Sequence, residues 1–367
     1  MNIVYPDYRR CGLNVVSSIM HYFGTENPHP GFQPLTRVLG ERRWRNVVLM
    51  LFDGMGMKTL EEFLPEDAFL RKNLFAVLSA VYPSTTVNVT TTLECGKSPK
   101  EHAWLGWTLY FREIGQYVDV FLNSYEGKKA ADYPVAQRYI PRKFIFPKMT
   151  AAGECEACCV SPHSEQVKIG TLDELFTKTE ELCHDPVRRY IYTYWGEPDH
   201  SMHLAGCSDR RIGEIVREID ERTERLSAAA GGETLILVTA DHGLTDGKFF
   251  YLEDYPHLVR MLIRLPAIEC RAAAFYVKPG MKEAFAEAFM QTFGAHFLLI
   301  EKEEFIARFL GDGEESDHLR EFTGDYMALS VDEYCIANKR KESEMKGVHA
   351  GLTRDEMLVP LILVQGS

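Results

Sequence analysis

The feature that most constrains this chain of 367 residues is a largely apolar run that leads into an aspartate, a pattern that occurs three times. The runs cover residues 46–52, 190–195 and 234–240, and the aspartates that follow them are Asp53, Asp199 and Asp241. An apolar run of strand length predicts a strand buried on both faces, as in a parallel sheet covered by helices. Because ligands of open α/β sheets bind at the carboxyl ends of the strands, the three aspartates are candidates for one site.

The segment between the second and third runs, residues 208–229, has the pattern of an amphipathic helix. Ile212, Val216 and Ile219 fall on one apolar stripe, and Ser208 is a suitable N-cap. A strand, a helix and a strand in this order predict a βαβ unit. We therefore expect an α/β fold in which helices sandwich a mostly parallel central sheet.

The positions at which the alternation of apolar strands and helices begins, is interrupted and resumes predict the domain organisation. We expect a helical lead-in over residues 1–45, a core over 46–264 and 341–367, and a small inserted α/β subdomain over 265–340. Within the insertion, the pattern predicts strands at 272–277 and 297–300 and a helix over 281–293.

Composition argues against several functions. The formal net charge is -12, and so acidic a chain is a poor partner for a nucleic-acid duplex, whose phosphates bind clustered Lys and Arg. No run of about 18 apolar residues occurs, so no membrane span is expected. We also expect a cytoplasmic protein with reduced thiols, because no basic segment followed by an apolar one opens the sequence and its nine cysteines are an odd number.

Three cysteines, Cys155, Cys158 and Cys159, lie close together in the sequence, with His163 after them. The spacing is compatible with a structural zinc site, but one CxxC pair without a second pair is weak evidence for such a site. We favour a surface hairpin that carries free thiols.

Histidines stand close to two of the strand-end aspartates. His203 follows Asp199 by four residues, and His242 follows Asp241 directly. Carboxylates and imidazoles in such sets suit Zn²⁺, with Mn²⁺ as the alternative. A single strand-end aspartate is as often a turn or cap residue, so the combination of three favours a metal site.

A second candidate for chemistry is the segment Pro83-Ser-Thr-Thr86. Such a turn leading into a helix places a hydroxyl at the helix N-terminus, where the dipole favours an alkoxide and the phosphate that it attacks. The alternative is an ordinary Ser/Thr N-cap, and for the segment alone we favour that alternative.

Taken together, these segments resemble the nucleotide pyrophosphatase/phosphodiesterase branch of the alkaline phosphatase superfamily. The resemblance rests on Asp53, Pro83-Ser-Thr-Thr86, Glu197-Pro-Asp199 with His203, Asp241-His242-Gly243 and His349-Ala-Gly, which follow the family order from about residue 46 onwards. It implies two divalent metal ions. One would be held by Asp53, Thr86, Asp241 and His242, and the other by Asp199, His203 and His349.

The resemblance also implies an activity, namely the hydrolysis of phosphodiester or pyrophosphate bonds in a small-molecule phosphate ester. Thr86 would be the nucleophile and would form a phosphothreonine intermediate, with Ser84 and Thr85 open as alternatives. A threonine hydroxyl has a pKa far above 7, so coordination to a metal is the activation that it needs.

One departure from the family pattern affects substrate choice. Where the diesterase branch has an asparagine that binds a phosphoryl oxygen, this chain has Trp107, which offers one indole N–H and a large apolar face. Three alternatives therefore stay open: a phosphomonoesterase, a phosphosugar mutase of the same superfamily, and a non-catalytic protein that binds phosphate or metal. The sequence leaves the natural substrate and the oligomeric state open.

Overall fold

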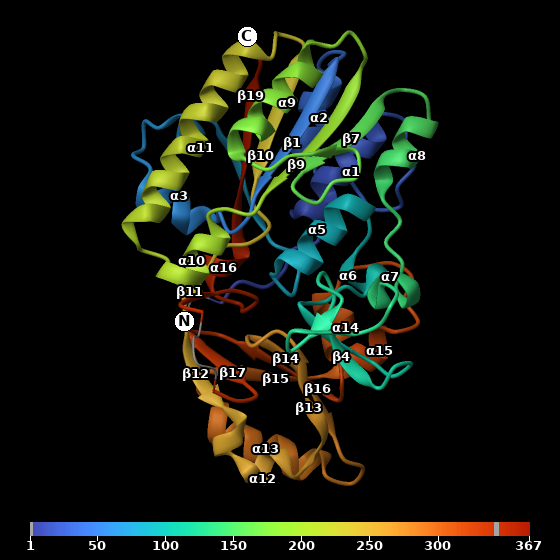
Figure 1. Cartoon of the computed structure of the whole chain (residues 1–367), viewed down its shortest axis with the longest axis vertical. Helices are drawn as coiled ribbons and strands as arrows, with labels where there is room; N and C mark the ends of the chain where they lie inside the picture. The colour runs from blue at the N-terminus through green and yellow to red at the C-terminus, as the bar shows by residue number, and fades with distance from the viewer. Residues whose placement is uncertain (1–2, 341–344) are drawn as a thin grey trace.

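The computed structural model describes residues 3–340 and 345–367. Figure 1 shows two bodies stacked along the long axis: an upper one in which helices flank a sheet, and a lower one built on a second sheet. Two predicted ranges extend beyond the described residues, because the lead-in at 1–45 includes the first two residues and the return segment at 341–367 includes 341–344.

The upper sheet has seven strands in the order β2-β19-β10-β1-β9-β7-β8. They are β1 (Asn46–Phe52), β2 (Leu74–Ser79), β7 (Glu156–Ser161), β8 (Val167–Lys168), β9 (Arg189–Trp195), β10 (Thr234–Thr239) and β19 (Leu358–Gln365). β1 lies between β9 and β10, runs parallel to both and is buried along its whole length. β19 pairs antiparallel with both β10 and β2, and the other pairs of neighbouring strands in this sheet are parallel. This arrangement confirms the predicted fold class.

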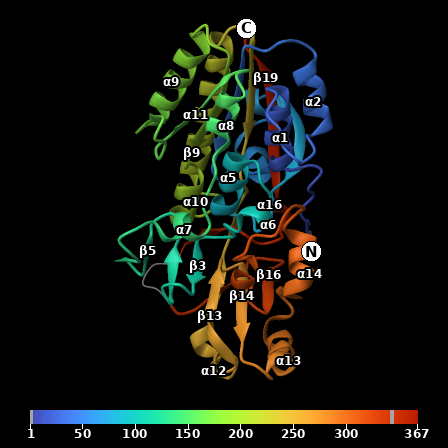
Figure 2. The same cartoon turned by 90° about the vertical axis from the view of Figure 1, so that its right-hand side faces the viewer.

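Helices cover both faces of this sheet. They are α1 (Gly12–Tyr22), α2 (Gln33–Gly40), α3 (Met57–Phe63), α4 (Phe69–Lys72), α5 (Thr86–Cys95), α8 (Ile145–Ala151), α9 (Leu172–His184) and α11 (Arg210–Ala229). Figure 2 shows α9 and α11 on one side of the sheet and α1 and α2 on the other. In the described part of the chain, no helix is both long enough and apolar enough to cross a membrane.

The start of α11 corrects one prediction. Ile212, Val216 and Ile219 are buried as expected. The N-cap, however, is Asp209 and not Ser208, since the Asp209 carboxylate accepts a hydrogen bond from the Arg211 amide at 3.0 Å. A carboxylate also interacts favourably with the positive end of the helix dipole, which gives Asp209 an advantage over a neighbouring serine.

The lower sheet has eight antiparallel strands in the order β15-β16-β14-β13-β3-β4-β5-β6. They are β3 (Thr108–Phe111), β4 (Gln116–Asp119), β5 (Ser124–Tyr125), β6 (Lys128–Lys129), β13 (Leu262–Ile268), β14 (Ala272–Val277), β15 (Phe297–Glu301) and β16 (Tyr326–Ser330). The predicted strands at 272–277 and 297–300 are β14 and β15, and the predicted helix is α13 (Lys282–Phe293). Because β3 to β6 also belong to this sheet, it extends beyond the range 265–340 predicted for an inserted subdomain.

Shorter elements lie around the two sheets. They are α6 (Pro99–His102), α7 (Val135–Tyr139), α10 (Asp199–Ala205), α12 (Pro256–Val259), α14 (Lys302–Phe309), α15 (Leu319–Phe322) and α16 (Arg354–Met357), a 3-10 turn over Leu252–Asp254, and the paired strands β11 (Thr245–Asp246) with β18 (Gly347–Val348) and β12 (Lys248–Tyr251) with β17 (Tyr334–Ala337).

The cysteine cluster lies in the core, so the predicted surface hairpin is wrong. Cys158 and Cys159 are on β7, inside the upper sheet, and Cys155 directly precedes that strand and is buried. All nine cysteines are free thiols. Burial raises the pKa of Cys159 to about 12, which favours an unreactive thiol. Among the described residues, no candidate metal-binding group includes these cysteines.

A buried ion pair joins the two bodies. Arg271, in the turn between β13 and β14, donates to Glu356 of α16 through Nε (2.6 Å) and Nη2 (2.7 Å), and neither side chain is accessible to solvent. Arg271 also donates to the carbonyls of Asp332 and Tyr334. Glu356 in turn accepts a hydrogen bond from the Gly351 amide at 2.7 Å. The pair therefore fixes the return segment of the core against a turn of the lower sheet.

We expect Glu356→Gln to lower the free energy of unfolding by about 3–5 kcal/mol, because it leaves the buried Arg271 charge without its counter-charge. Urea unfolding would measure the change. The matched control is Arg354→Ala on the same helix, whose pair with Glu61 is 46% and 39% exposed and should contribute less than about 1 kcal/mol. A Glu356→Gln variant as stable as the control would contradict this role.

Candidate metal centre

The three strand-end aspartates meet at one edge of the upper sheet. Asp53 follows β1, Asp199 begins α10 just after β9, and Asp241 follows β10. Backbone contacts fix this meeting point: the Asp199 amide donates to the Asp53 carbonyl, and the Gly54 amide donates to the Asp241 carboxylate, each at 3.0 Å. Gly54 has a φ of +71°, and a Cβ there would lie 2.9 Å from the Cα of Asp199. The close approach therefore requires glycine.

Asp199, His203 and His349, which the resemblance assigns to one metal ion, lie together in one group. One potential ligand atom from each lies within 4.8 Å of the others. His203 Nε2 is 3.1 Å from Asp199 Oδ2, and His203 Nδ1 is hydrogen-bonded to the Gly347 carbonyl at 2.7 Å. That carbonyl orients the ring and leaves Nε2 for a ligand, an arrangement typical of metal-binding histidines.

Asp53, Asp241, His242 and Thr86 form a second, adjoining group. His242 Nε2 lies 3.7 Å from Asp53 Oδ1 and 3.4 Å from Asp241 Oδ2. Thr86 Oγ1 lies 3.4 Å from Asp53 Oδ1 and 3.3 Å from His242 Nε2. The two groups touch, since the rings of His242 and His349 are stacked with centroids 4.0 Å apart. Asp199 also lies within 4.8 Å of the Asp53 and His242 ligand atoms.

The three consecutive hydroxyls before and at the start of α5 have different partners. The Ser84 hydroxyl donates to the Gly351 carbonyl at 3.1 Å, and the Thr85 hydroxyl donates to Glu269 at 2.8 Å. Of the three, only the Thr86 hydroxyl contacts Asp53 and His242. The geometry thus separates Thr86 from the two alternatives that the sequence left open.

Buried charges in this cluster repel one another. Burial raises the pKa of Asp53 well above its ordinary value, and the carboxylates of Asp241 and Asp199 raise it further. For Asp199 the opposing effect of burial is outweighed by His203, so its pKa is lowered. Burial likewise lowers the pKa of His203, but Asp199 overcomes this effect and the pKa rises to about 9. Burial and the neighbouring His242 hold the pKa of His349 well below its usual range.

The side chains fit divalent metal ions. Three buried atoms of this cluster have no hydrogen-bond partner within the described residues: Asp199 Oδ1, Asp241 Oδ2 and His349 Nδ1. Unpaired buried polar atoms are costly, and a cation bound between them would remove that cost for the two oxygens and the imidazole nitrogen. A set of three carboxylates, three imidazoles and one hydroxyl is typical of zinc and also suits manganese.

Two residues near this cluster were not predicted from the sequence. The Tyr194 hydroxyl, at the end of β9, donates to Asp53 Oδ2 at 2.6 Å. Glu269 accepts hydrogen bonds from the Thr85 hydroxyl and the Trp107 amide, each at 2.8 Å. Tyr194 could have been suggested by alternation along the strand that ends near Asp199, whereas nothing local in the sequence distinguishes Glu269.

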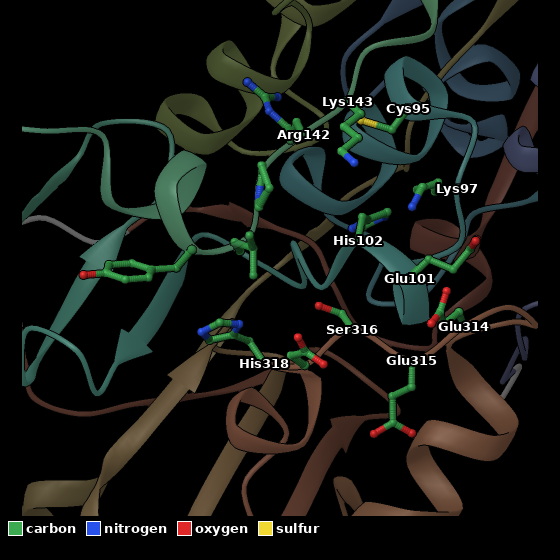
Figure 3. Close-up of a pocket in the computed structure, with 14 residues that line it drawn as sticks. Cys95, Lys97, Glu101, His102, Arg142, Lys143, Glu314, Glu315, Ser316 and His318 are labelled. Carbon is green, nitrogen blue, oxygen red and sulfur yellow. The ribbon is translucent and has the colours of Figure 1, made fainter.

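A separate cavity of about 310 Å³ lies between the C-terminal end of α5 and the loop at 314–318. Figure 3 shows Lys97 and Lys143 above it and Glu314 and Glu315 to its lower right. Its one buried histidine, His102, uses both ring nitrogens within the protein, one with the Thr92 hydroxyl and one with the Trp104 amide. None of the seven predicted ligands lines this cavity, so it is distinct from the metal centre.

We expect Tyr194→Phe to weaken metal binding by about 10- to 100-fold, the usual effect of removing a hydrogen bond that orients a ligand. The matched control is Tyr192→Phe on the same strand, because the buried Tyr192 hydroxyl has no hydrogen-bond partner within the described residues. Calorimetric titration of Zn²⁺ into the metal-free form of each variant would measure the two affinities. Equal affinities in the two variants would exclude an orienting role for Tyr194.

The family profile described as Type I phosphodiesterase / nucleotide pyrophosphatase matches residues 47–352, a range that contains all seven candidate ligands. A search of curated proteins found no match. Solved structures share the fold. Murine ectonucleotide pyrophosphatase / phosphodiesterase 5 is 18% identical over 86% of this chain and 87% of its own, with a TM-score of 0.63. The human protein of that name is 16% identical over 87% of each chain, with a TM-score of 0.66.

A third solved structure is phosphonoacetate hydrolase from Sinorhizobium meliloti 1021 in complex with phosphonoformate, 16% identical over 88% of this chain and 90% of its own, with a TM-score of 0.65. The profile match covers most of the sequence and the fold agrees with it. The chain therefore belongs to the type I phosphodiesterase / nucleotide pyrophosphatase family and is a hydrolase that acts on phosphate esters.

Proposed function

We propose that this enzyme hydrolyses phosphodiester or pyrophosphate bonds in two steps, through a covalent phosphothreonine on Thr86 and with two zinc ions. The observation that carries the proposal is the position of the Thr86 hydroxyl, at the first residue of α5 and in contact with both Asp53 and His242. A hydroxyl at a helix N-terminus lies where the dipole stabilises negative charge on the nucleophile and on the phosphoryl group.

The chain's own groups account for the bond changes. In the first step the Thr86 oxygen bonds to phosphorus, its proton passes to an adjacent acceptor, and the bond from phosphorus to the leaving oxygen breaks. In the second step a water oxygen bonds to phosphorus, the bond to Thr86 breaks, and the proton that the water loses passes to the Thr86 oxygen, which restores the hydroxyl. Metals held by the two Asp/His groups would lower the pKa of the nucleophile and stabilise charge on the phosphoryl oxygens.

Two further observations support a threonine nucleophile and a diester substrate. An inactive threonine-to-alanine variant of murine ectonucleotide pyrophosphatase / phosphodiesterase 5, 16% identical to this chain, has been solved in complex with AMP. In this chain the nucleophile lies next to a carboxylate, because Glu269 is bonded to Thr85. A monoester dianion would be repelled by that carboxylate more strongly than a diester with one negative charge.

We expect Thr86→Ala to abolish turnover while the bound metal stays near the wild-type amount, since the Asp and His ligands remain. Ser84→Ala is the matched control, because the Ser84 hydroxyl contacts the Gly351 carbonyl and not the cluster. Steady-state rates and elemental analysis of the same samples would test this. Wild-type turnover in Thr86→Ala would exclude Thr86 as the nucleophile.

We expect bis(p-nitrophenyl) phosphate to be hydrolysed with a higher kcat/KM than p-nitrophenyl phosphate, by about tenfold or more. One unit of charge near the Glu269 carboxylate can account for a difference of that order. Elemental analysis of the protein used for the assay should find about two zinc ions per chain. Faster hydrolysis of the monoester would instead indicate a phosphomonoesterase or a phosphosugar mutase.

A further inference from the structure

A cavity with charged walls lies between the two bodies, apart from the metal centre. Its volume of about 310 Å³ is within the range of small-molecule binding sites. Figure 3 shows Lys97 and Lys143 on one side of it and Glu314 on the other. The residues on the lysine side come from the end of α5, from α6 and from residues 139–143, and those on the other side come from residues 314–318. A ligand in this cavity would therefore contact both bodies.

Four charged side chains of the cavity have no partner of opposite charge. Among the described residues, the ion pairs of the cavity join Arg142 to Glu94, Glu101 to His29, Glu315 to Arg320 and His318 to Glu113. The side chains that form neither an ion pair nor a hydrogen bond with the described residues are Lys97, Lys143, Glu314 and Asp317. Two positive and two negative charges of this cavity are therefore available to a ligand.

Lys97, Lys143 and Arg142 form the basic wall of the cavity. Arg142 donates to Glu94 at 3.3 Å, but burial raises the pKa of Glu94 to about 7 despite this contact, so Glu94 neutralises Arg142 only partly at neutral pH. Burial lowers the pKa of His102 to about 3, and the charges of Lys97 and Arg142 contribute to that shift. His102 is therefore neutral, and the wall carries the charges of its two lysines and part of that of its arginine.

Glu314 and Asp317 form the acidic wall, on a loop that is held by contacts of its main chain. The Ser316 amide donates to the Lys100 carbonyl at 3.0 Å. Gly313 has a φ of +128°, and a Cβ there would lie 2.5 Å from Glu101 Cγ, so the close approach of the loop requires glycine. Neither contact uses an acidic side chain of the loop, so the two unpaired acids are not needed for them.

Opposite charges on two walls of one cavity favour a ligand that carries both charges. An anion would be attracted to the basic wall and repelled by the acidic wall, and a cation would meet the reverse. A molecule with a carboxylate at one end and an ammonium group at the other would form charge-assisted hydrogen bonds with both walls. Such a molecule is the ligand class that fits the cavity.

We propose that this cavity is a binding site for a small zwitterion, whose carboxylate contacts the basic wall and whose ammonium group contacts the acidic wall. None of the cavity residues is a predicted metal ligand, so the site does not depend on the hydrolysis proposed at Thr86. Because α5 begins at Thr86 and ends at Cys95, which lines the cavity, the ligand lies at the far end of the helix that carries the proposed nucleophile.

Three probes with the same chain length test the site because they differ in charge. They are 6-aminohexanoate, which carries both charges, hexanoate, which lacks the ammonium group, and hexylammonium, which lacks the carboxylate. Calorimetric titration into the wild-type holoenzyme should find 6-aminohexanoate bound about tenfold or more tightly than either of the others, the order of one charge-assisted contact. If hexanoate or hexylammonium binds as tightly as 6-aminohexanoate, the proposal is wrong.

Two double variants locate the binding of these probes. Lys97→Gln combined with Lys143→Gln removes two charges from the basic wall, so 6-aminohexanoate should lose most of its advantage over hexylammonium. Glu314→Gln combined with Asp317→Asn removes the charge of the acidic wall, so 6-aminohexanoate should lose most of its advantage over hexanoate. A wild-type ratio of affinities in either double variant would overturn the proposal, because the zwitterion would then bind elsewhere, for example with its carboxylate at the metal centre.

The matched control is Lys72→Gln combined with Glu66→Gln, which changes two exposed side chains of the upper body outside the cavity. This variant should keep both wild-type ratios of affinities. The four side chains changed in the cavity are partly or fully exposed, so those variants should keep the fold, and thermal unfolding would verify this. A control that lost both ratios to the same extent as the cavity variants would contradict the assignment of the site.

Discussion

The approach of three carboxylates at the ends of adjacent parallel strands is the constraint on which the rest of the structure depends. β9, β1 and β10 are buried, parallel neighbours. Asp199, Asp53 and Asp241 follow their carboxyl ends and therefore lie close together at one edge of the sheet. Burial raises the pKa of Asp53, and repulsion from the carboxylates of Asp241 and Asp199 raises it further. The arrangement is therefore costly on its own, and bound divalent cations would turn that repulsion into attraction.

The lower sheet contacts the segments that form this site. The turn between β13 and β14 carries Glu269, which accepts a hydrogen bond from Thr85 just before α5, and Arg271, which contacts Glu356 in the return segment after His349. Two charged residues only two positions apart thus tie the lower sheet to both sides of the metal centre. Since Arg271 and Glu356 are both inaccessible to solvent, breaking this pair is more costly than breaking a surface pair.

Each residue predicted as a metal ligand follows a strong local signal in the sequence. Three apolar runs locate the ends of the strands, and short motifs add His203, His242 and His349. The structure brings the seven predicted residues into two touching groups. The features that were missed have no local signal in the sequence. Glu269 lies in a turn of the second sheet, and Arg271 is buried because the two bodies pack against each other.

The errors have similar physical causes. Ser208 and Asp209 are both acceptable caps, and only the geometry of the first turn of α11 decides between them. The spacing of the cysteines around Cys155 favours a surface hairpin with free thiols, but Cys158 and Cys159 take part in β7 because it pairs with β9, about 30 residues further along the chain. Likewise, residues 108–129 join the lower sheet where β3 pairs with β13 at Thr108 and Ile268, which no local pattern predicts.

Three consecutive hydroxyls connect the start of α5 to three different segments of the chain. Ser84 is fixed to the segment after His349, Thr85 to the turn of the lower sheet, and Thr86 to the ligands of the upper sheet. The proposed nucleophile therefore lies where three distant segments meet, within two residues of a contact to each of them. Since positioning errors of about 1 Å can cost a hundredfold in rate, the contacts of Ser84 and Thr85 would also influence the alignment of Thr86 in the proposed reaction.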